Sequence, residues 1–151
     1  MSDERLLYDV ADGVATVTLN RPEKRNALDA ATVAALREAF ARAGADPDVR
    51  VVLLRGAGND FCAGADLAHM ERLAATGDPL ENLADAAALG DLFIEMRRLE
   101  KPIVAAVHGH AFAGGAGLAT ACDLVVASES AVFGYPEVHL GFVPAMVMTL
   151  L

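Results

Sequence analysis

The spacing of apolar and polar residues changes several times along this chain, and each change marks an expected element. Residues 6–10 and 14–19 are predicted to form strands, and the Asp12-Gly13 pair between them is a hairpin turn signal. From Asp29 to residue 43 the apolar residues recur at helical spacing, and Asp29 is a suitable N-cap. We therefore expect a β-hairpin followed by an amphipathic helix.

Further along, short apolar runs alternate with segments of helical character. Residues 51–54 and 103–107 are continuously apolar, as is typical of strands in a sheet that is covered on both faces, and residues 124–127 predict another strand. Predicted helices separate these strands. They cover residues 66–76, 80–99 and 115–122. This alternation predicts an α/β domain.

Two loops of small residues each follow a buried strand and lead into a helix. The first covers residues 56–64 and the second covers residues 109–114. Small residues let a ligand approach the backbone, and the first turn of a helix leaves its N–H groups unpaired. Two such loops can each direct one N–H group at a single oxygen, as an oxyanion hole requires. A tight turn capped by Asp66, and small-residue packing in the second loop, remain structural alternatives.

The second loop also invites comparison with nucleotide-binding motifs. Residues 115–120 approach the GxGxxG fingerprint, but they lack its last glycine and lie far from the N-terminal βαβ position. The Lys-Ser/Thr pair of a P-loop is missing. The sequence therefore favours neither a dinucleotide site nor a P-loop.

The acidic composition limits the partners that we expect. The 151 residues carry a formal net charge of −9, and 54% of them are hydrophobic. A chain of this length can bury a core, and it has no basic stripe for a nucleic-acid backbone. No apolar run has the length and purity of a membrane span, and the first residues do not resemble a signal peptide. We expect a cytoplasmic protein that binds neither nucleic acid nor a membrane.

The cysteines and histidines show no spacing typical of a metal site. Cys62 and Cys122 lie far apart, and we expect two reduced, partly buried thiols. His108, His110 and His139 are not spaced like metal ligands, and we expect them to pack or to form hydrogen bonds. No metal is expected.

Several blocks of sequence, in a fixed order, point to one family. The blocks are residues 20–28, 61–67, 101–109, 113–115, 122–123, 133–137 and 140–144. Together they resemble the crotonase family, which is also called the enoyl-CoA hydratase/isomerase family. The resemblance covers almost the whole chain, and it implies an α/β fold built as a spiral of ββα units.

The end of the chain affects how much of that fold we expect. Residues 145–151 form an apolar, helix-prone run without a cap or a polar face. We therefore expect residues 1–151 to form the N-terminal crotonase core, with the C-terminal helical portion missing. In the family that portion closes the acyl pocket and builds oligomers, so the resemblance implies a homotrimer or hexamer for a full-length protein.

The resemblance also assigns the site residues. It implies that the backbone N–H groups of Ala65 and Gly114 form an oxyanion hole for a thioester carbonyl, and that Glu137 transfers protons. Coenzyme A is then part of the substrate, and no separate cofactor is implied. Charged side chains in the coenzyme A site would suit its phosphates. The residues implied to bind this substrate are Lys24, Arg25, Ala27, Ala63, Asp66, Leu67 and Ala68.

Family hydratases commonly use two glutamates, and this chain keeps one of them. Position 117 is glycine here, whereas Glu137 is present after Pro136. We expect an enoyl-CoA hydratase of fatty acid metabolism, which converts a 2-enoyl-CoA to a 3-hydroxyacyl-CoA. Two alternatives stay open: a Δ3,Δ2-enoyl-CoA isomerase that uses Glu137 alone, and a non-catalytic acyl-CoA-binding protein. Candidate replacements for the missing carboxylate are Glu71, Asp91 and Glu95, which otherwise belong to solvated helix faces.

Overall fold

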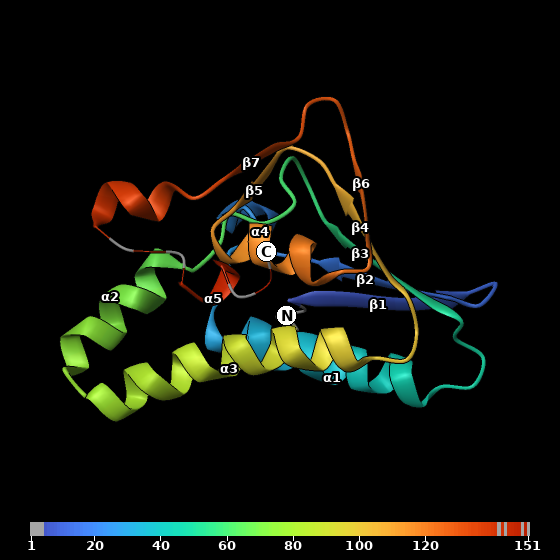
Figure 1. The fold of residues 1–151 in the computed structure, drawn as a ribbon, viewed down its shortest axis with the longest axis horizontal. Helices are drawn as coiled ribbons and strands as arrows, with labels where there is room; N and C mark the ends of the chain where they lie inside the picture. The colour runs from blue at the N-terminus through green and yellow to red at the C-terminus, as the bar shows by residue number, and fades with distance from the viewer. Residues whose placement is uncertain (1–4, 142, 144, 149, 151) are drawn as a thin grey trace.

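The hairpin at the start of the chain forms one edge of a five-stranded sheet. In the computed structural model, which describes residues 5–141, 143, 145–148 and 150, strands β1 (Leu6–Ala11) and β2 (Val14–Leu19) pair antiparallel (Figure 1). Asp12 and Gly13 between them have φ values of 53° and 81°, which a tight hairpin turn of the primed type requires. The predicted hairpin is therefore confirmed.

Parallel strands continue this sheet. Its order is β1-β2-β3-β4-β6, and β3 (Val51–Gly56), β4 (Ile103–Val107) and β6 (Leu124–Ala127) run parallel to β2. Each parallel step needs a crossover, which helices provide. Alternate residues of β3 and β4 are buried, so these two strands lie in the core as predicted.

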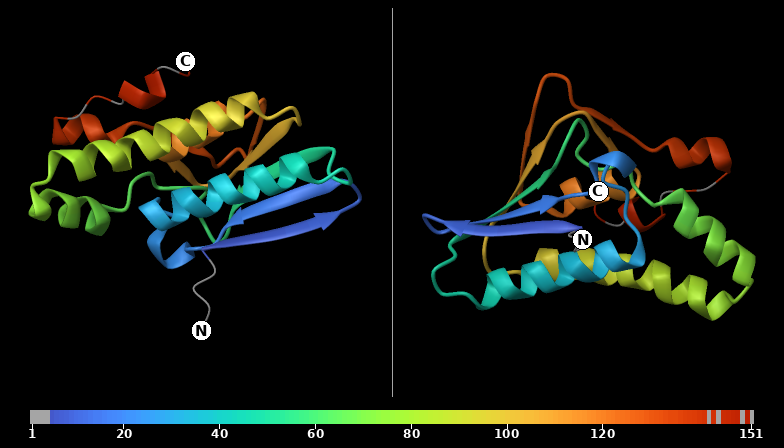
Figure 2. Two further views of the ribbon diagram at one scale, coloured as in Figure 1. Left: turned by 90° about the horizontal axis from the view of Figure 1, so that it is seen from below. Right: turned by 180° about the vertical axis from the view of Figure 1, so that it is seen from behind.

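The helices pack against one another, and some of them also pack against strands. They are α1 (Ala30–Ala45), α2 (Leu67–Thr76), α3 (Pro79–Arg98), α4 (Gly114–Ala121) and α5 (Ala145–Met148). Figures 1 and 2 show α1 and α3 side by side below the sheet, with α2 folded back from the far end of α3. Leu36 of α1 and Phe93 of α3 belong to the same hydrophobic core. None of the described helices is long and apolar enough to span a membrane.

Aspartates begin three of these helices, and two of these caps were predicted from the sequence. Asp29 Oδ1 accepts a hydrogen bond from Thr32 N–H at 2.9 Å, and Asp66 Oδ1 accepts one from Ala68 N–H at 3.0 Å. Such caps satisfy backbone donors that have no partner inside the helix. Both predicted N-caps are confirmed.

A second, two-stranded sheet departs from the sequence prediction. β5 (His110–Phe112) pairs in parallel with β7 (Val132–Gly134), so the prediction that residues 109–114 form a loop is wrong for the residues of β5. Each strand is only a few residues long, and its partner lies far along the chain. The local pattern therefore gives no signal for this pairing. A short 3-10 helix, Pro136–Leu140, follows β7.

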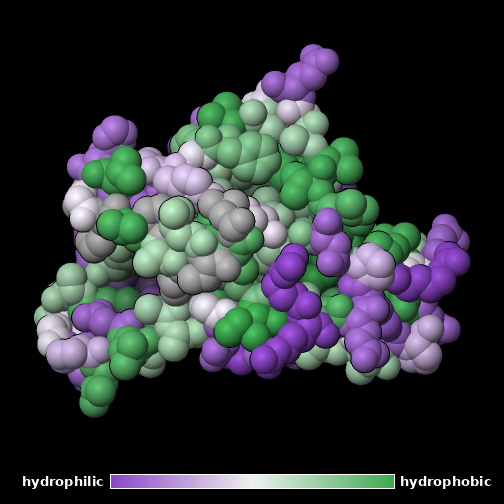
Figure 3. Space-filling view, viewed as in Figure 1, coloured by the Kyte–Doolittle hydropathy of each residue, from purple (hydrophilic) through white to green (hydrophobic). Residues whose placement is uncertain are grey.

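The outer strand β6 leaves apolar side chains uncovered. Leu124 and Val126 are 62% and 64% exposed, and Val125 is also exposed. Figure 3 shows this apolar surface over β6, with a polar tip above it where the chain turns toward β7. An apolar surface of this kind differs from the buried faces of β3 and β4, which helices cover.

Candidate active site

Backbone hydrogen bonds hold the two small-residue loops side by side. Cys62 N–H donates to His110 O at 3.0 Å, and Phe112 N–H donates to Cys62 O at 2.9 Å. Gly115 allows this close approach, because a Cβ added there would lie 2.3 Å from Cys62 O. Segments that lie about fifty positions apart in the sequence therefore meet at the start of α4.

Ala65 lies in this region with its backbone N–H turned away from Leu28. Leu28 N–H donates to Gly64 O at 2.7 Å, and Asp66 N–H donates to Leu28 O at 2.8 Å, which makes a parallel bridge between Leu28 and Ala65. Because backbone groups alternate in direction along an extended segment, Ala65 directs its own N–H away from Leu28. Within the described part of the chain, this N–H group has no backbone partner.

Gly114 supplies a second candidate donor at the N-terminus of α4. It is the first residue of the helix, and the cap residue Ala113 has the unusual φ of 49° and forms no side-chain cap. The first N–H groups of a helix lack partners and attract negative charge. A Cβ added at Gly64 would lie 3.4 Å from Gly114 N, so the segment that carries Ala65 touches the start of α4. The structure thus places Ala65 and Gly114 on neighbouring loops, and their joint action on a substrate oxygen stays a prediction.

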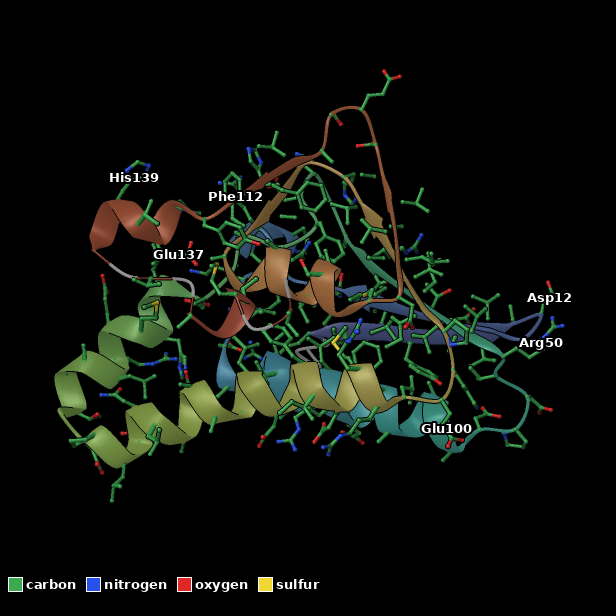
Figure 4. The ribbon with its side chains drawn as sticks, viewed as in Figure 1. Asp12, Arg50, Glu100, Phe112, Glu137 and His139 are labelled. Atoms are coloured by element: carbon green, nitrogen blue, oxygen red, sulfur yellow. The ribbon has the colours of Figure 1, made fainter. Side chains whose placement is uncertain are left out.

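Glu137 lies in the 3-10 helix that follows β7, and one of its carboxylate oxygens is buried. Among the described residues Glu137 Oε2 has no hydrogen-bond partner, although the side chain as a whole is half-buried. Figure 4 shows the Glu137 and His139 side chains on opposite sides of this turn. A buried carboxylate oxygen without a partner is costly, and such groups are typical of sites where a ligand supplies the missing hydrogen bond.

The position of the second family glutamate is filled by apolar groups. A Cβ added at Gly117 would lie 2.7 Å from Phe93 Cζ and 2.9 Å from Val147 Cγ2. The prediction that a nearby helix supplies a replacement is wrong for Glu95, because Arg37 Nε donates to Glu95 Oε2 at 2.9 Å on the exposed surface. The other two candidates, Glu71 and Asp91, are exposed.

The residues predicted to bind coenzyme A differ in their solvent exposure. The exposed ones are Lys24, Arg25, Leu67 and Ala68; Ala63 is half-buried, and Ala27 and Asp66 are buried. Arg25 Nε donates to Asp60 Oδ2 at 2.8 Å, so part of its charge is already paired. The Asp66 carboxylate caps α2 and binds Arg21, and its backbone N–H donates to Leu28 O, so its polar groups are already engaged. Their roles in binding stay predictions.

Asp60 connects the first loop to β5. Its Oδ1 accepts a hydrogen bond from His110 N–H at 3.0 Å and lies 2.5 Å from His110 Nδ1. The hydrogen bond from Arg25 holds the pKa of Asp60 well below its usual range against the cost of burial, and His110 adds to this effect. His108 Nε2 lies 3.0 Å from Gly58 O. Hydrogen-bonding roles are therefore confirmed for His108 and His110.

One histidine that the sequence did not single out joins two helices. His69 Nε2 of α2 lies 2.7 Å from Asp85 Oδ1 of α3. The two residues belong to separate predicted helices, and no spacing rule relates them. This contact fixes α2 against α3 beside the first loop.

Within the described ranges, the thiols and the acidic groups show no arrangement for a metal. Cys62 and Cys122 are free and buried, and burial raises the pKa of each thiol to about 12. Both thiols are unpaired, as expected, but they are almost completely buried and not partly buried as predicted. In the part of the chain that the structure describes, no three His, Cys, Asp or Glu side chains gather as possible metal ligands.

Comparison with curated proteins identifies relatives over most of the chain. A putative enoyl-CoA hydratase from Thermus thermophilus is 50% identical over 138 residues, which are 91% of this chain and 54% of that protein. A mevalonyl-coenzyme A hydratase from Aspergillus fumigatus is 43% identical over 85% of this chain and 46% of its own length. The chain therefore spans about half the length of the curated relatives that it matches.

Solved structures and a family model agree with these relatives. A putative enoyl-CoA hydratase/isomerase (crotonase) from Legionella pneumophila matches with a TM-score of 0.92 and 42% identity, over 97% of this chain and 56% of that chain. Pseudomonas aeruginosa AtuE matches with a TM-score of 0.92 and 38% identity, over 97% of this chain and 57% of that one. These matches confirm the predicted crotonase-type α/β fold. A model described as enoyl-CoA hydratase/isomerase matches residues 9–151, and the chain belongs to this family.

Proposed function

We propose that this protein binds an acyl-CoA thioester, stabilises its enolate and acts as an enoyl-CoA hydratase. The observation that carries this proposal is the pair of neighbouring N–H groups, on Ala65 and Gly114, that have no backbone partner among the residues that the structure describes. Such groups suit the negative charge that develops on a thioester oxygen. The relatives named as hydratases, among them those from Thermus thermophilus and Aspergillus fumigatus, support the hydratase reaction.

Glu137 is the proposed acid–base group. Its carboxylate accepts a proton from a water molecule as the water oxygen bonds to C3 of the 2-enoyl-CoA. The electron pair of the C2–C3 double bond moves to give an enolate, whose oxygen the N–H groups of Ala65 and Gly114 stabilise. Glu137 then returns the proton to C2 and the carbonyl forms again. The product is a 3-hydroxyacyl-CoA, and the carboxylate is regenerated.

The proposed binding of coenzyme A uses the first loop and the turn before Leu28. Lys24 and Arg25 are exposed there and can approach phosphates, since Arg25 keeps N–H groups beyond the two that bind Asp60. The backbone of Ala27, Ala63 and the start of α2 would lie along the rest of the molecule. Coenzyme A is part of the substrate, and the reaction needs no further cofactor.

We also propose an oligomeric state, a location and a metabolic role for the enzyme. For a full-length protein we infer a homotrimer or hexamer in the cytoplasm that acts in fatty acid metabolism, as the resemblance to the family implies. Sedimentation of the purified protein tests the assembly, and imaging of a tagged chain tests the location.

An isomerase is the second candidate, and the filled space at Gly117 favours it. With Phe93 and Val147 in contact there, Glu137 is the one carboxylate of the family pair that this chain retains. Moving a proton between Cα and Cγ of a 3-enoyl-CoA needs a single base, whereas hydration usually employs two groups. A non-catalytic acyl-CoA-binding protein would need no acid–base group at all.

One assay separates these functions. The purified protein is incubated with crotonyl-CoA and, separately, with a 3-enoyl-CoA, while the absorbance of the conjugated thioester is followed. A hydratase removes this absorbance from crotonyl-CoA, and an isomerase creates it from the 3-enoyl-CoA. Tight binding of both esters without turnover would favour the non-catalytic protein.

Substitution at Glu137 tests the acid–base role directly. We expect Glu137→Gln to lower turnover by about 10²–10⁴-fold, as is typical for loss of a general acid–base group. His139→Gln, on the other side of the same turn, is the matched control and should leave turnover unchanged. Hydration that survives Glu137→Gln would rule out the role given to Glu137.

A further inference from the structure

The Arg21 guanidinium joins the two backbone segments on either side of the Ala65 bridge. Arg21 Nη1 donates to Ala27 O at 2.7 Å, and Arg21 Nη2 donates to Asp66 Oδ2 at 2.8 Å. Ala27 precedes Leu28, the residue that pairs with Ala65, and Asp66 follows Ala65. A single side chain therefore binds the neighbour of each partner in this bridge.

These contacts are shielded from water. The side chains of Arg21 and Asp66 are 11% and 10% exposed. A buried carboxylate that loses its charged partner is strongly destabilised, so the position of Asp66 depends on Arg21. Burial by itself would raise the pKa of Asp66, but the hydrogen bonds from Arg21 and from the N–H groups of His69 and Ala68 lower it. The Asp66 carboxylate is therefore charged at neutral pH.

Asp66 carries the constraint into the backbone around Ala65. Its Oδ1 accepts hydrogen bonds from Ala68 N–H at 3.0 Å and from His69 N–H at 3.3 Å. Its own N–H donates to Leu28 O at 2.8 Å. The peptide that contains the Ala65 N–H thus lies between a backbone bridge on one side and a capped helix on the other, and Arg21 contacts both.

We propose that Arg21 is a positioning residue for the oxyanion hole, which it serves by fixing the direction of the Ala65 N–H. The inference rests on the proposed function. Arg21 contacts no reacting atom, and it acts through Ala27 and Asp66. Because a misplacement of about 1 Å can lower a rate by about 10²-fold, a small shift of this peptide is sufficient to matter.

A structural role alone is the competing explanation. Arg21 Nη1 also lies 3.3 Å from Asp29 Oδ2, the N-cap of α1, so loss of Arg21 will lower stability whatever it does for the site. The test therefore needs a readout that responds to the donor itself. The stretching frequency of a thioester carbonyl falls when hydrogen-bond donors polarise it, and it can be measured on a bound saturated ester that does not react.

The experiment compares Arg21→Lys and Arg21→Gln with the unsubstituted protein, using carbonyl-labelled butyryl-CoA and infrared difference spectra. In the unsubstituted protein the carbonyl frequency should fall on binding. In Arg21→Gln it should return toward the value in water, and kcat for crotonyl-CoA should fall about 10–100-fold. The Kd for butyryl-CoA should change by less than about 3-fold, since one hydrogen bond contributes little to so large a ligand. Arg21→Lys keeps the charge without the two-pronged contact and should lie between these values.

Arg5→Gln is the matched control. Arg5 Nη1 lies 2.6 Å from Asp29 Oδ2, so this variant removes an arginine that binds the same N-cap as Arg21. It should lower the thermal midpoint while leaving the carbonyl frequency and kcat unchanged. If Arg21→Gln does not fold, Arg21→Lys carries the comparison.

Two results would overturn the inference. In the first, a folded Arg21 variant keeps the lowered carbonyl frequency and a kcat within about 2-fold of the unsubstituted protein. In the second, Arg5→Gln shifts both quantities as far as Arg21→Gln does. An unsubstituted protein that shows neither a lowered frequency nor turnover overturns the proposed function, and the role of Arg21 with it.

Discussion

The Phe93 ring lies against the backbone of Gly117, and a Cβ added to this glycine would come within 2.7 Å of Phe93 Cζ. Phe93 belongs to α3 and is almost completely buried, and Gly117 lies inside α4. The glycine therefore allows α4 to pack closely on α3. The carboxylate that family hydratases commonly carry at this position would displace an aromatic ring from the core.

This contact predicts that Gly117→Ala destabilises the protein even though alanine is the better helix former. The gain in helix propensity is about 1 kcal/mol, but overpacking a core typically costs about 1–3 kcal/mol, so we expect a net loss of up to about 2 kcal/mol. Urea denaturation measures it. In a Phe93→Leu background the ring atoms are gone and the penalty should shrink. An equal penalty in both backgrounds would show that the ring is not the cause.

The sequence pattern predicted those features that depend on residues close to one another along the chain. Asp29 and Asp66 were recognised as caps because each binds N–H groups two or three positions ahead. The pair of Arg21 and Asp66 was missed because 45 positions separate them and no periodicity relates them.

The small sheet and the site also depend on contacts between residues that lie far apart in the sequence. The pairing of β5 with β7 depends on a turn of the chain that no short window contains. The resemblance to a family marked Ala65, Gly114 and Glu137, but the sequence did not show that Phe93 fills the space at Gly117. That contact joins α3 to α4, so it can be recognised only when the packing of the two helices is known.

Asp60 predicts a pH-dependent loss of stability. Its pKa is lowered in the folded protein, mainly by the hydrogen bond from Arg25, whereas the unfolded value is about 3.9. The stabilisation is therefore complete above about pH 4 and is lost as the pH falls toward the lower pKa of the folded state. Because Arg25 is half exposed, we expect Asp60→Asn to cost only about 1 kcal/mol at pH 7.

The check is urea denaturation of both proteins at pH 7, pH 5 and pH 3. The difference between them should be constant from pH 7 to pH 5 and smaller at pH 3. Asp9→Asn, on the exposed side of β1, is the control and should match the parent protein at each pH. A difference that grows on acidification would contradict the assigned direction.

The helix caps predict that replacing aspartate with alanine lowers stability by different amounts at two N-cap positions. Asp29 is buried and also pairs with Arg5, whereas Asp78 caps α3 at an exposed site through Leu80 N–H at 2.8 Å. We expect Asp29→Ala to cost about 2–3 kcal/mol and Asp78→Ala about 0.5–1 kcal/mol. Thermal or urea unfolding compares them. Asp29→Asn keeps the cap acceptor and should fall between the two, and equal losses at the two sites would show that the ion pairs add nothing.

Burial of both cysteines predicts that the folded protein is inert to thiol reagents. The pKa of Cys62 and of Cys122 is raised to about 12 by burial, so the thiolate that reacts is scarce at pH 8 and shielded from the reagent. We expect Ellman's reagent to label neither thiol in the native state and two thiols per chain in denaturant. Ser128→Cys places a thiol at an exposed position and should react at once, as a positive control.

Any slow labelling of the parent protein should follow its unfolding rate. Rapid native labelling that disappears in Cys62→Ala or Cys122→Ala would show that the loop or helix around that thiol opens far more often than its packing implies.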